Sequence, residues 1–378
     1  MTNFFNFDAL TWPEVAALSR DTPLVLPLGD TYPPTPLSEV LDHPVTIGLL
    51  PDIPFGYAHS GLRVPVPIIS KVVDNLVAGL QEDGFTRIYV LSPPEIELEI
   101  EADRIFLIPE RTPSPLPSEY DRDKVILLPV GHTEQHGYHL PLSTDSLIIQ
   151  AIGKGVSQAV PGLAASLPAF PYGVSTHRNS FAGTFSVGGR AFEDFWVAVI
   201  DDLVERGWDR FYLISGHGGN SSFLVNVVKY AGERHKRIFC ATAWLYLSGP
   251  QGISALEGYR RSKIGGMGHA CELETSLILH LQPDLVHMQR AVDETDFIST
   301  PSYYMDWVEG GALIANPPWD DDTKTGAYGA GSLADPENGR LWLEAAIAEK
   351  VSHIYEINEQ HRRREERRNA GFGLWGQH

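Results

Sequence analysis

The sequence has few cysteines, few basic residues and no long apolar run, and each scarcity excludes a class of protein. Cys240 and Cys271 are the two cysteines among 378 residues, so no disulfide framework is expected and a reducing compartment is favoured. No apolar run approaches the ~20 residues that span a bilayer. The N-terminus lacks the basic start and apolar core of a secretory signal. We therefore predict a cytoplasmic protein without a membrane partner.

Basic residues are outnumbered by acidic ones. The chain has 29 Lys and Arg against 48 Asp and Glu, which gives a formal net charge of −19 at pH 7. A surface of this sign repels phosphates, so we predict no nucleic-acid partner. The Arg-rich run from Arg362 to Arg368 is interrupted by Glu365 and Glu366, and we interpret it as a solvated helix face. Charged residues (20%) and apolar residues (43%) are in the usual globular range, which fits an enzyme.

Short apolar runs alternate with helical patterns along the chain. The runs that we predict as buried strands are 24–28, 45–50, 87–91, 125–130, 211–215 and 238–243. In 191–206, Phe192, Phe195 and Trp196 begin an apolar series with a 3.6-residue period, and Gly207 is a natural helix end. Strands that alternate with helices imply βαβ units. We therefore predict an α/β fold with a mainly parallel sheet flanked by helices.

The first candidate site follows the apolar run 125–130. The loop that begins at Gly131 carries Glu134 and His136, two residues apart, and the segment closes with Asp145. Carboxylate and imidazole donors together suit Zn²⁺, Mn²⁺ or Fe²⁺. A strand exit is also where an α/β sheet usually presents its functional residues. A polar, solvated loop is the alternative and would be favoured for an isolated Glu-x-His, but two further clusters follow.

These further clusters have the same character. After the apolar run 211–214, three glycines surround His217, and glycine permits the close approaches of a crowded site. The third cluster, 268–276, opens a helical pattern with Glu272 near the helix start and Glu274 on roughly the opposite side. Acidic residues are also common in a first helical turn because they complement the helix dipole, so either glutamate could have that role alone.

Together, the three clusters resemble the creatininase family of metal-dependent amidohydrolases. The matching pieces are Pro129-Val130-Gly131-x-Thr133-Glu134-Gln135-His136-Gly137, Leu140-Pro141-Leu142-x-Thr144-Asp145, Gly216-His217-Gly218-Gly219-Asn220 and His269-Ala270-x-Glu272-x-Glu274-Thr275-Ser276. Further matches are Pro171-Tyr172-Gly173-Val174-Ser175-x-His177, Phe181-x-Gly183-Thr184 and Gly326-x-Tyr328-Gly329 with Asp335-Pro336. The resemblance covers roughly residues 120–355, and the order and spacing of the motifs are specific. It implies the α/β/α layers of the family.

The resemblance also implies a site for two divalent ions, Zn, Mn or Fe, and no organic cofactor. Carried over to the matching positions, the metal ligands would be Glu134, His136, Asp145 and His217. Asp145 would bridge the two ions. The enzyme that gives the family its name has a Glu where this chain has Gly219, and our candidate for the missing carboxylate is Glu272. This departure indicates that the substrate is not creatinine.

The chemistry that the resemblance implies is hydrolysis of a C–N bond in a small molecule. A metal-bound hydroxide would attack the carbonyl of a cyclic amide, a formamide or a related amide. Glu272, His177 and His269 are the candidate catalytic residues; His177 could instead anchor its loop, and His269 could cap the following helix. Two alternatives stay open: ring opening of a cyclic ketone or lactone, and a non-catalytic metal-binding or scaffolding role. A homo-oligomer is also expected.

A weaker copy of the family pattern precedes these motifs. The segments that align are 26–34 with 128–136, 54–56 with 171–173 and 83–92 with 206–215. Tyr32, Pro34 and Pro94 stand where the catalytic copy has its Glu, His and His, so the first copy has lost the metal-binding chemistry. Chance similarity between short apolar strands is the alternative. We predict a degenerate, non-catalytic half-copy of the fold at 1–105, a linker at 106–123 and the hydrolase domain at 124–378.

Overall fold

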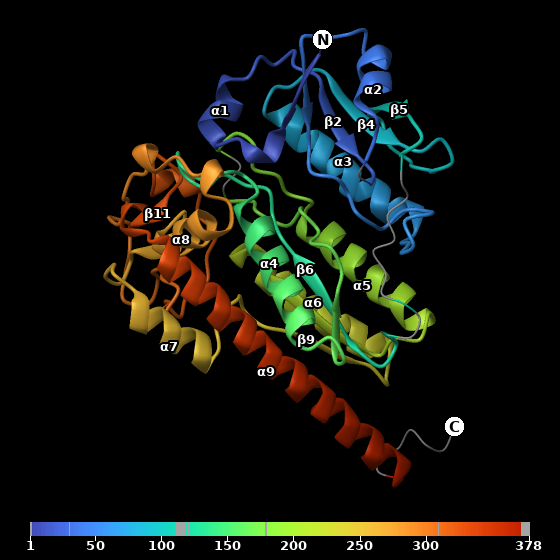
Figure 1. Ribbon diagram of the computed structural model, residues 1–378, viewed down its shortest axis with the longest axis vertical. Coiled ribbons are helices and arrows are strands. Elements are labelled where there is room, and N and C mark those ends of the chain that lie inside the picture. The colour runs from blue at the N-terminus through green and yellow to red at the C-terminus, as the bar shows by residue number, and fades with distance from the viewer. Residues whose placement is uncertain are drawn as a thin grey trace.

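The computed structural model describes residues 2–29, 31–110, 118, 121–177, 180–308 and 310–371. It contains two parallel β-sheets with helices on their faces, so the predicted α/β class is confirmed. The N-terminal sheet, blue in Figure 1, lies above the larger C-terminal half, and the long helix α9 (Pro336–Asn369) crosses that half and extends beyond it. Within the described ranges, no helix combines the length and the apolar character needed to cross a bilayer.

The C-terminal sheet has four parallel strands in the order β7-β6-β8-β9. They are β6 (Val125–Val130), β7 (Ala164–Ser166), β8 (Arg210–Ser215) and β9 (Phe239–Thr242). One face packs on α5 (Gly189–Glu205) and α6 (Ser221–Arg234), the other on α4 (Thr144–Ala159), α8 (Glu272–Leu281) and α9. The other elements here are α7 (Pro250–Tyr259), β10 (Met267–His269) and β11 (Tyr328–Gly329). Because both faces are covered, β6 and β8 are continuous apolar runs.

The N-terminal sheet has five parallel strands in the order β1-β3-β2-β4-β5. They are β1 (Asn3–Asn6), β2 (Leu24–Pro27), β3 (Thr46–Leu49), β4 (Ile88–Ser92) and β5 (Asp103–Phe106). The helices are α1 (Trp12–Ala17), α2 (Pro34–Val40) and α3 (Val66–Glu82). Leu24 and Leu26 face the core that contains α3, whereas Val25 faces α2, as the alternation of a strand requires.

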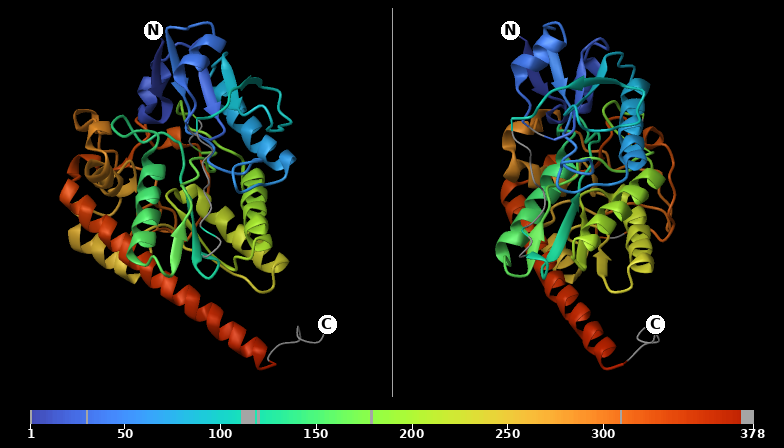
Figure 2. Two further views of the ribbon diagram at one scale, coloured as in Figure 1. Left: turned by 45° about the vertical axis from the view of Figure 1, so that its right-hand side comes forward. Right: turned by 90° about the vertical axis from the view of Figure 1, so that its right-hand side faces the viewer.

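The two halves share one apolar core, and both views of Figure 2 place the N-terminal half directly on top of the other. Helix α3 packs against α5, and a Cβ at Gly56 would lie only 2.7 Å from the ring of Phe195. The rings of Phe55 and Phe195 stack with centroids 6.3 Å apart. The hydroxyl of Tyr172 donates to the carbonyl of Pro51 at 2.6 Å. Core packing therefore fixes the N-terminal half in place.

Four strands of each sheet follow the same order. In the N-terminal sheet the order is β3-β2-β4-β5, and in the C-terminal sheet it is β7-β6-β8-β9, with every pair parallel. The hydrogen bonds at the strand exits also correspond. The amide of Gly29 donates to the carbonyl of Ile53 at 2.9 Å, and the amide of Gly131 donates to that of Phe170 at 2.9 Å. The two sheets therefore share the order of four strands and the hydrogen bond at the exit of the corresponding strand.

The sequence located the regular elements that carry strong periodicity. All six predicted strands form, and α5 covers the predicted helix and ends before Gly207, whose φ is +99°. The strands β1, β5, β7, β10 and β11 were not predicted, because their short segments contain polar or small residues and do not form a continuous apolar run. The predicted linker, 106–123, lies partly outside the described residues, which omit 111–117, 119 and 120.

One contact between the halves predicts a pH effect on stability. Burial raises the pKa of Asp8 from 3.8 to about 6, and the backbone carbonyl of Asp8 accepts a bond from Ser143 N at 3.0 Å. The folded state therefore binds a proton at the Asp8 carboxyl more tightly than the unfolded state does. The contribution of this protonated carboxyl to the free energy of unfolding is full below pH ~4 and is lost as the pH rises through ~6. We expect Asp8→Asn to raise the free energy of unfolding at pH 7.5, by at most about 3 kcal/mol, with little change at pH 4.

Thermal unfolding at the two pH values measures this effect. Asp103→Asn, at an exposed position of β5, is the matched control. Its effect on the unfolding temperature should be the same at both pH values. An equal shift of Asp8→Asn at both pH values would show that proton binding at Asp8 is not the cause.

Candidate metal centre

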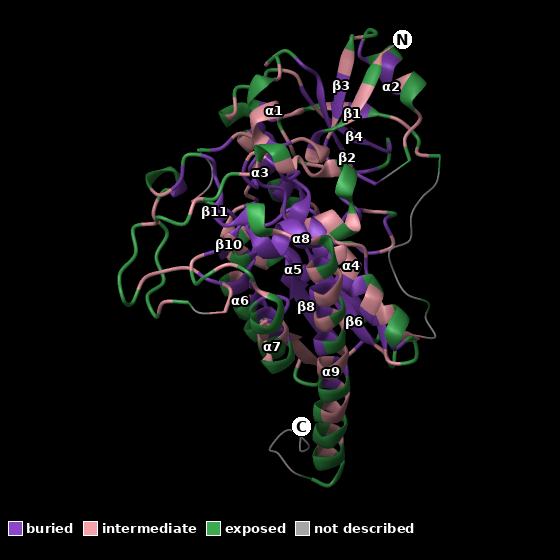
Figure 3. Ribbon diagram, turned by 60° about the vertical axis from the view of Figure 1, so that its left-hand side comes forward, coloured by how far each residue is buried: buried purple, intermediate pink, exposed green. Residues whose placement is uncertain are grey.

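Seven titratable side chains converge where the carboxyl ends of β6 and β8 meet. They are His132, Glu134, His136, Asp145, His217, His269 and Glu274, each no more than 3% exposed. The first three follow β6, Asp145 lies in the first turn of α4, His217 follows β8, and the last two come from β10 and α8. Figure 3 shows this region of β6, β8 and α8 as buried. A parallel sheet places such exits on one edge, which explains how distant segments meet here.

The carboxylate of Asp145 lies between two imidazoles. Its Oδ1 is 3.2 Å from His136 Nε2, and its Oδ2 is 3.4 Å from His217 Nδ1. A second carboxylate accompanies each imidazole: Glu134 Oε1 is 3.0 Å from His217 Nδ1, and Glu274 Oε1 is 3.9 Å from His136 Nε2. Two donor sets therefore adjoin, with Asp145 shared between them.

Backbone carbonyls hold the outer nitrogens of three imidazoles, and one of these is His269, whose Nε2 lies 2.7 Å from the carbonyl of Gln135. His136 Nδ1 lies 3.1 Å from the carbonyl of Glu134, and His217 Nε2 lies 3.1 Å from that of Val174. A carbonyl only accepts, so each of these nitrogens carries the proton and the other nitrogen presents its lone pair to the cluster. This outer hydrogen bond is how proteins commonly fix the tautomer of a metal-binding histidine.

His132 is oriented the other way, so that the nitrogen that faces the cluster carries the proton. The amide of Gly173 donates to His132 Nδ1 at 2.9 Å, so in the neutral ring the proton is on Nε2. That nitrogen lies 3.8 Å from Glu134 Oε2. Although His132 is close enough to join a metal-binding group with Glu134 and His217, it faces the cluster as a donor, and we assign it no ligand role.

The donor set fits divalent metal ions. Three carboxylates buried side by side repel one another, and a divalent cation removes that repulsion. Nitrogen and oxygen donors of this mixture suit Zn²⁺, Mn²⁺ and Fe²⁺. The centre also lies at the sheet edge where parallel α/β proteins bind their ligands.

Comparison with known proteins agrees with this chemistry. Residues 112–354, well over half of the chain, match the family described as "Creatininase: Creatinine amidohydrolase". The chain belongs to the creatininase family. Creatinine amidohydrolase of Pseudomonas putida is 30% identical over 245 residues, which cover 60% of this chain and 86% of that protein. A mycofactocin precursor peptide peptidase of Mycobacterium ulcerans is 35% identical over 193 residues, covering 47% of this chain and 66% of that protein.

The fold comparison gives the same family. A solved structure of creatininase with Mn has a TM-score of 0.52 and 26% sequence identity, and the match covers 63% of this chain and 93% of that chain. This creatininase-family protein is accordingly a metal-dependent hydrolase of C–N bonds, as the motifs predicted.

Four of the five predicted ligands come together, and Glu272 does not. Oε1 of Glu272 accepts from the amide of Arg261 at 2.8 Å, and its Oε2 accepts from that of Ser262 at 2.7 Å. Glu274, which we expected to face away, is the glutamate of α8 that points to His136. Residues two apart on a helix differ by about 200° around its axis, so only one of the pair can face the cluster. The expectation that Glu274 faces away from the cluster and Glu272 faces it is therefore wrong.

A glutamate at position 219 would not fit this site. A Cβ at Gly219 would lie 2.3 Å from His217 Nε2 and 2.4 Å from the carbonyl of Val174, which are the two atoms of the bond that orients His217. The carboxylate missing from the loop after β8 must therefore come from another element, and Glu274 is placed to supply it.

The two predicted catalytic histidines lie in different places. His269 belongs to the cluster: its Nδ1 is 3.7 Å from Glu134 Oε1, and its ring centroid is 4.2 Å from that of His136. His177 is in none of the metal-binding groups of the described residues, and its ring packs edge-on against Trp319 with centroids 5.2 Å apart. The amide of Trp319 donates to the backbone carbonyl of His177 at 2.8 Å. A catalytic role of His177 stays a prediction.

Sequence reasoning missed two residues of the centre. His132 precedes Glu134 and His136 at intervals of two, and that regular spacing could have revealed it. Ser175, whose Oγ donates to Glu134 Oε2 at 3.0 Å, carried no signal apart from its place in a family motif.

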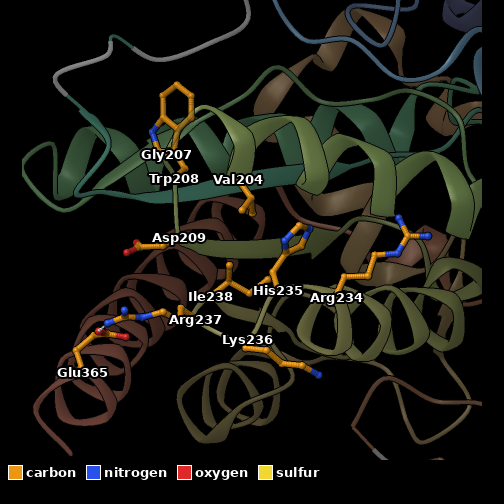
Figure 4. Close-up of a pocket in the computed structure, with 10 residues that line it drawn as sticks. All are labelled: Val204, Gly207, Trp208, Asp209, Arg234, His235, Lys236, Arg237, Ile238 and Glu365. Atoms are coloured by element: carbon orange, nitrogen blue, oxygen red, sulfur yellow. Dashed lines mark hydrogen bonds and ion pairs between the residues drawn. The ribbon is translucent and has the colours of Figure 1, made fainter. Parts of the chain in front are cut away.

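A surface hollow of about 560 Å³ lies at the other end of the sheet, where β8 and β9 begin (Figure 4). Three of its basic side chains are paired with carboxylates. Arg234 and His235 both bind Asp201, at 2.5 and 2.6 Å, and Arg237 pairs with Glu365. This hollow is remote from the buried donors, so it is not part of the candidate metal centre.

Proposed function

We propose that the protein hydrolyses the C–N bond of a small cyclic amide, a formamide or a related amide, with two divalent ions at the buried cluster. The observation that carries the proposal is Asp145, whose two oxygens face two separate donor sets. One ion would be held by Glu134, Asp145 and His217. The other would be held by His136, Asp145 and Glu274.

Bound divalent ions at such a site acidify a water molecule and polarise the substrate carbonyl. The chain's own residues would move the proton. His269 carries a proton on Nε2, 2.7 Å from the carbonyl of Gln135, and presents the lone pair of Nδ1 to the cluster. His269 Nδ1 would take the proton of the attacking water and return it to the leaving nitrogen. Ser175 and His132, which direct an O–H and an N–H towards Glu134, would hold that carboxylate in place.

Metal analysis together with a substrate panel tests this proposal. The purified chain should contain up to two Zn, Mn or Fe ions, and it should hydrolyse at least one member of a panel of creatinine, a cyclic amide, an N-formyl amine and a short peptide. A lactone added to the panel tests ring opening as the alternative. His136→Ala, purified in the same way, is the control for contaminating hydrolases, and it should lose both metal and activity.

Two outcomes would contradict amide hydrolysis. Cleavage of the lactone alone would favour the ring-opening reaction. Full metal occupancy without turnover of any carbonyl substrate would favour a binding or scaffolding role.

We also propose that residues 1–105 are a degenerate half-copy of the family fold, joined by a linker at 106–123 to a hydrolase domain at 124–378. The shared strand order of the two sheets supports this proposal, as does the matching bond at Gly29 and Gly131. Tyr32 occupies the place of a ligand, and its hydroxyl donates to the carbonyl of Leu28 at 2.7 Å. The half-copy would have a structural role in place of a catalytic one.

We also propose that the chain forms a homo-oligomer and lies in the cytoplasm. Because α3 of the half-copy packs on α5, that face of α5 would not be part of the contact between copies. Cys240 and Cys271 are free thiols, which suits a reducing cytoplasm.

A further inference from the structure

A turn at residues 181–185 connects the N-terminal half with the metal centre. Asp83, which follows the last residue of α3, accepts a hydrogen bond at Oδ2 from the amide of Gly183 at 2.8 Å. Gly183 has a φ of +83°, and a Cβ there would lie 2.8 Å from a side-chain carbon of Leu142. Only glycine suits this backbone angle and this close approach. A carboxylate of one half therefore holds a tightly packed turn of the other half.

The two residues after this glycine hold the loop of Glu134 from both sides. Thr184 Oγ1 accepts a bond from the amide of Gln135 at 3.0 Å. The amide of Phe185 donates to the carbonyl of Thr133 at 3.1 Å. The two residues that are bonded in this way are the neighbours of Glu134 in the chain. Three successive residues of the turn thus join the N-terminal half to the backbone on each side of a proposed metal ligand.

The backbone on each side of Glu134 governs where its carboxylate lies. Glu134 Oε1 is 3.0 Å from His217 Nδ1, and the carbonyl of Gln135 accepts from His269 Nε2 at 2.7 Å. Thr133 and Gln135 are buried, so the loss of a bond there leaves a polar group that solvent does not readily satisfy. A ligand set has to be held within about 0.5 Å of its working geometry. A small displacement of this loop would therefore disturb a proposed ligand and the proposed proton carrier together.

We propose that Asp83 is a positioning residue of the metal centre, and that its bond to Gly183 fixes the place of Glu134 through Thr184 and Phe185. This inference rests on the proposed function, because it takes Glu134 to be a ligand of one of the two ions. The N-terminal half thus acts on the metal centre without providing a ligand to it.

Asp83→Ala tests the inference, because it removes the acceptor and leaves the turn itself unchanged. In titration calorimetry with Mn²⁺ alone, the affinity of this variant should fall by about tenfold, the lower end of the effect expected for groups that orient a ligand. Asp83→Asn should restore most of the affinity, because an amide oxygen accepts the same bond from Gly183. Rescue by this replacement distinguishes the hydrogen bond from a general effect of truncating the side chain.

Ser70→Ala is the matched control. Ser70 also lies on α3 and is buried, and its Oγ accepts a bond from the amide of Glu99 at 2.8 Å. This bond has the same chemistry as that of Asp83 but stays within the N-terminal half. Both alanine variants should lower the unfolding temperature of the metal-free protein, since each leaves an amide without its acceptor. Only Asp83→Ala should lower the affinity for Mn²⁺.

Thr184→Val tests the next step of the path with a residue of similar shape. It removes the oxygen that accepts from the amide of Gln135, so it should also weaken the binding of Mn²⁺. In the double variant with Asp83→Ala, the combined loss should be smaller than the sum of the two single losses in free energy, because both changes act through one turn. Additive losses would contradict the path through Thr184.

Two results with Asp83→Ala would overturn the inference. Wild-type affinity for Mn²⁺ would show that the bond to Gly183 does not act on the metal centre. An equal loss of affinity in Ser70→Ala would show that general destabilisation of the N-terminal half is the cause. Failure of the wild-type chain itself to bind Mn²⁺ or Zn²⁺ would overturn the proposed function as well, so the two failures are distinguishable.

Discussion

Asp145→Ala should remove both metal ions and lower turnover by about 1,000-fold or more, because the loss of several kcal/mol of transition-state stabilisation has that effect on a rate. Asp145 has an oxygen facing each donor set, so its replacement should cost more metal than that of a ligand that serves a single ion. The metal-free variant should be as stable as the wild type or more stable, because one of three crowded carboxylates is gone. The stabilisation that added metal gives the wild type should disappear.

Metal analysis and thermal unfolding with and without Zn²⁺ measure these effects. Unchanged metal content in Asp145→Ala would refute the assignment of the centre.

The two glutamates of α8 provide the sharpest comparison. Glu274→Gln should lower the occupancy of one ion and reduce turnover strongly, since Glu274 faces His136. Glu272→Gln should keep the metal but lose stability, by about 1.5–3 kcal/mol, because the carboxylate accepts bonds from the amides of Arg261 and Ser262. The reverse pattern would restore our original choice of Glu272 as the ligand.

Removal of residues 1–105 should give a chain that aggregates or changes its oligomeric state. The deletion uncovers the face of α5 that packs on α3, including Phe195, which now stacks on Phe55. Each uncovered aromatic side chain adds roughly 150–250 Å² of apolar surface. Two such residues already approach the largest apolar patch of an ordinary monomer, about 300–600 Å².

The deletion should also weaken the metal centre. The amides of Leu142 and Ser143, just before α4, donate to the carbonyls of Leu10 and Asp8 at 2.9 and 3.0 Å. These bonds hold the loop that leads to Asp145. Size-exclusion chromatography and metal analysis of the shortened chain are the measurements, with the full chain in the same buffer as the control. A soluble fragment with normal metal content and assembly would show that the N-terminal half is an independent appendage.

Local pattern in the sequence was enough to determine much of this protein. Six of the strands, α5 and the α/β class could be predicted because apolar runs and helical periods are properties of contiguous residues. The resemblance to the creatininase family predicted Glu134, His136, Asp145 and His217 as one set of ligands, and the strand exits before Glu134 and His217 agree with it, because the carboxyl ends of parallel strands share an edge. From the net charge of −19 and the two cysteines we expected no nucleic-acid partner and no disulfide framework, and both stay predictions.

Only the tertiary structure decided which glutamate of α8 faces the metal centre and which nitrogen of His132 carries the proton. The rotation of α8 is set by its packing against α9, where a Cβ at Gly339 would lie 2.0 Å from the carbonyl of Ser276. That rotation turns Glu274 inward and Glu272 towards the chain at Arg261. The proton of His132 is likewise placed by the amide of Gly173, far along the chain. Such choices depend on contacts between distant segments, and no local pattern of residues records them.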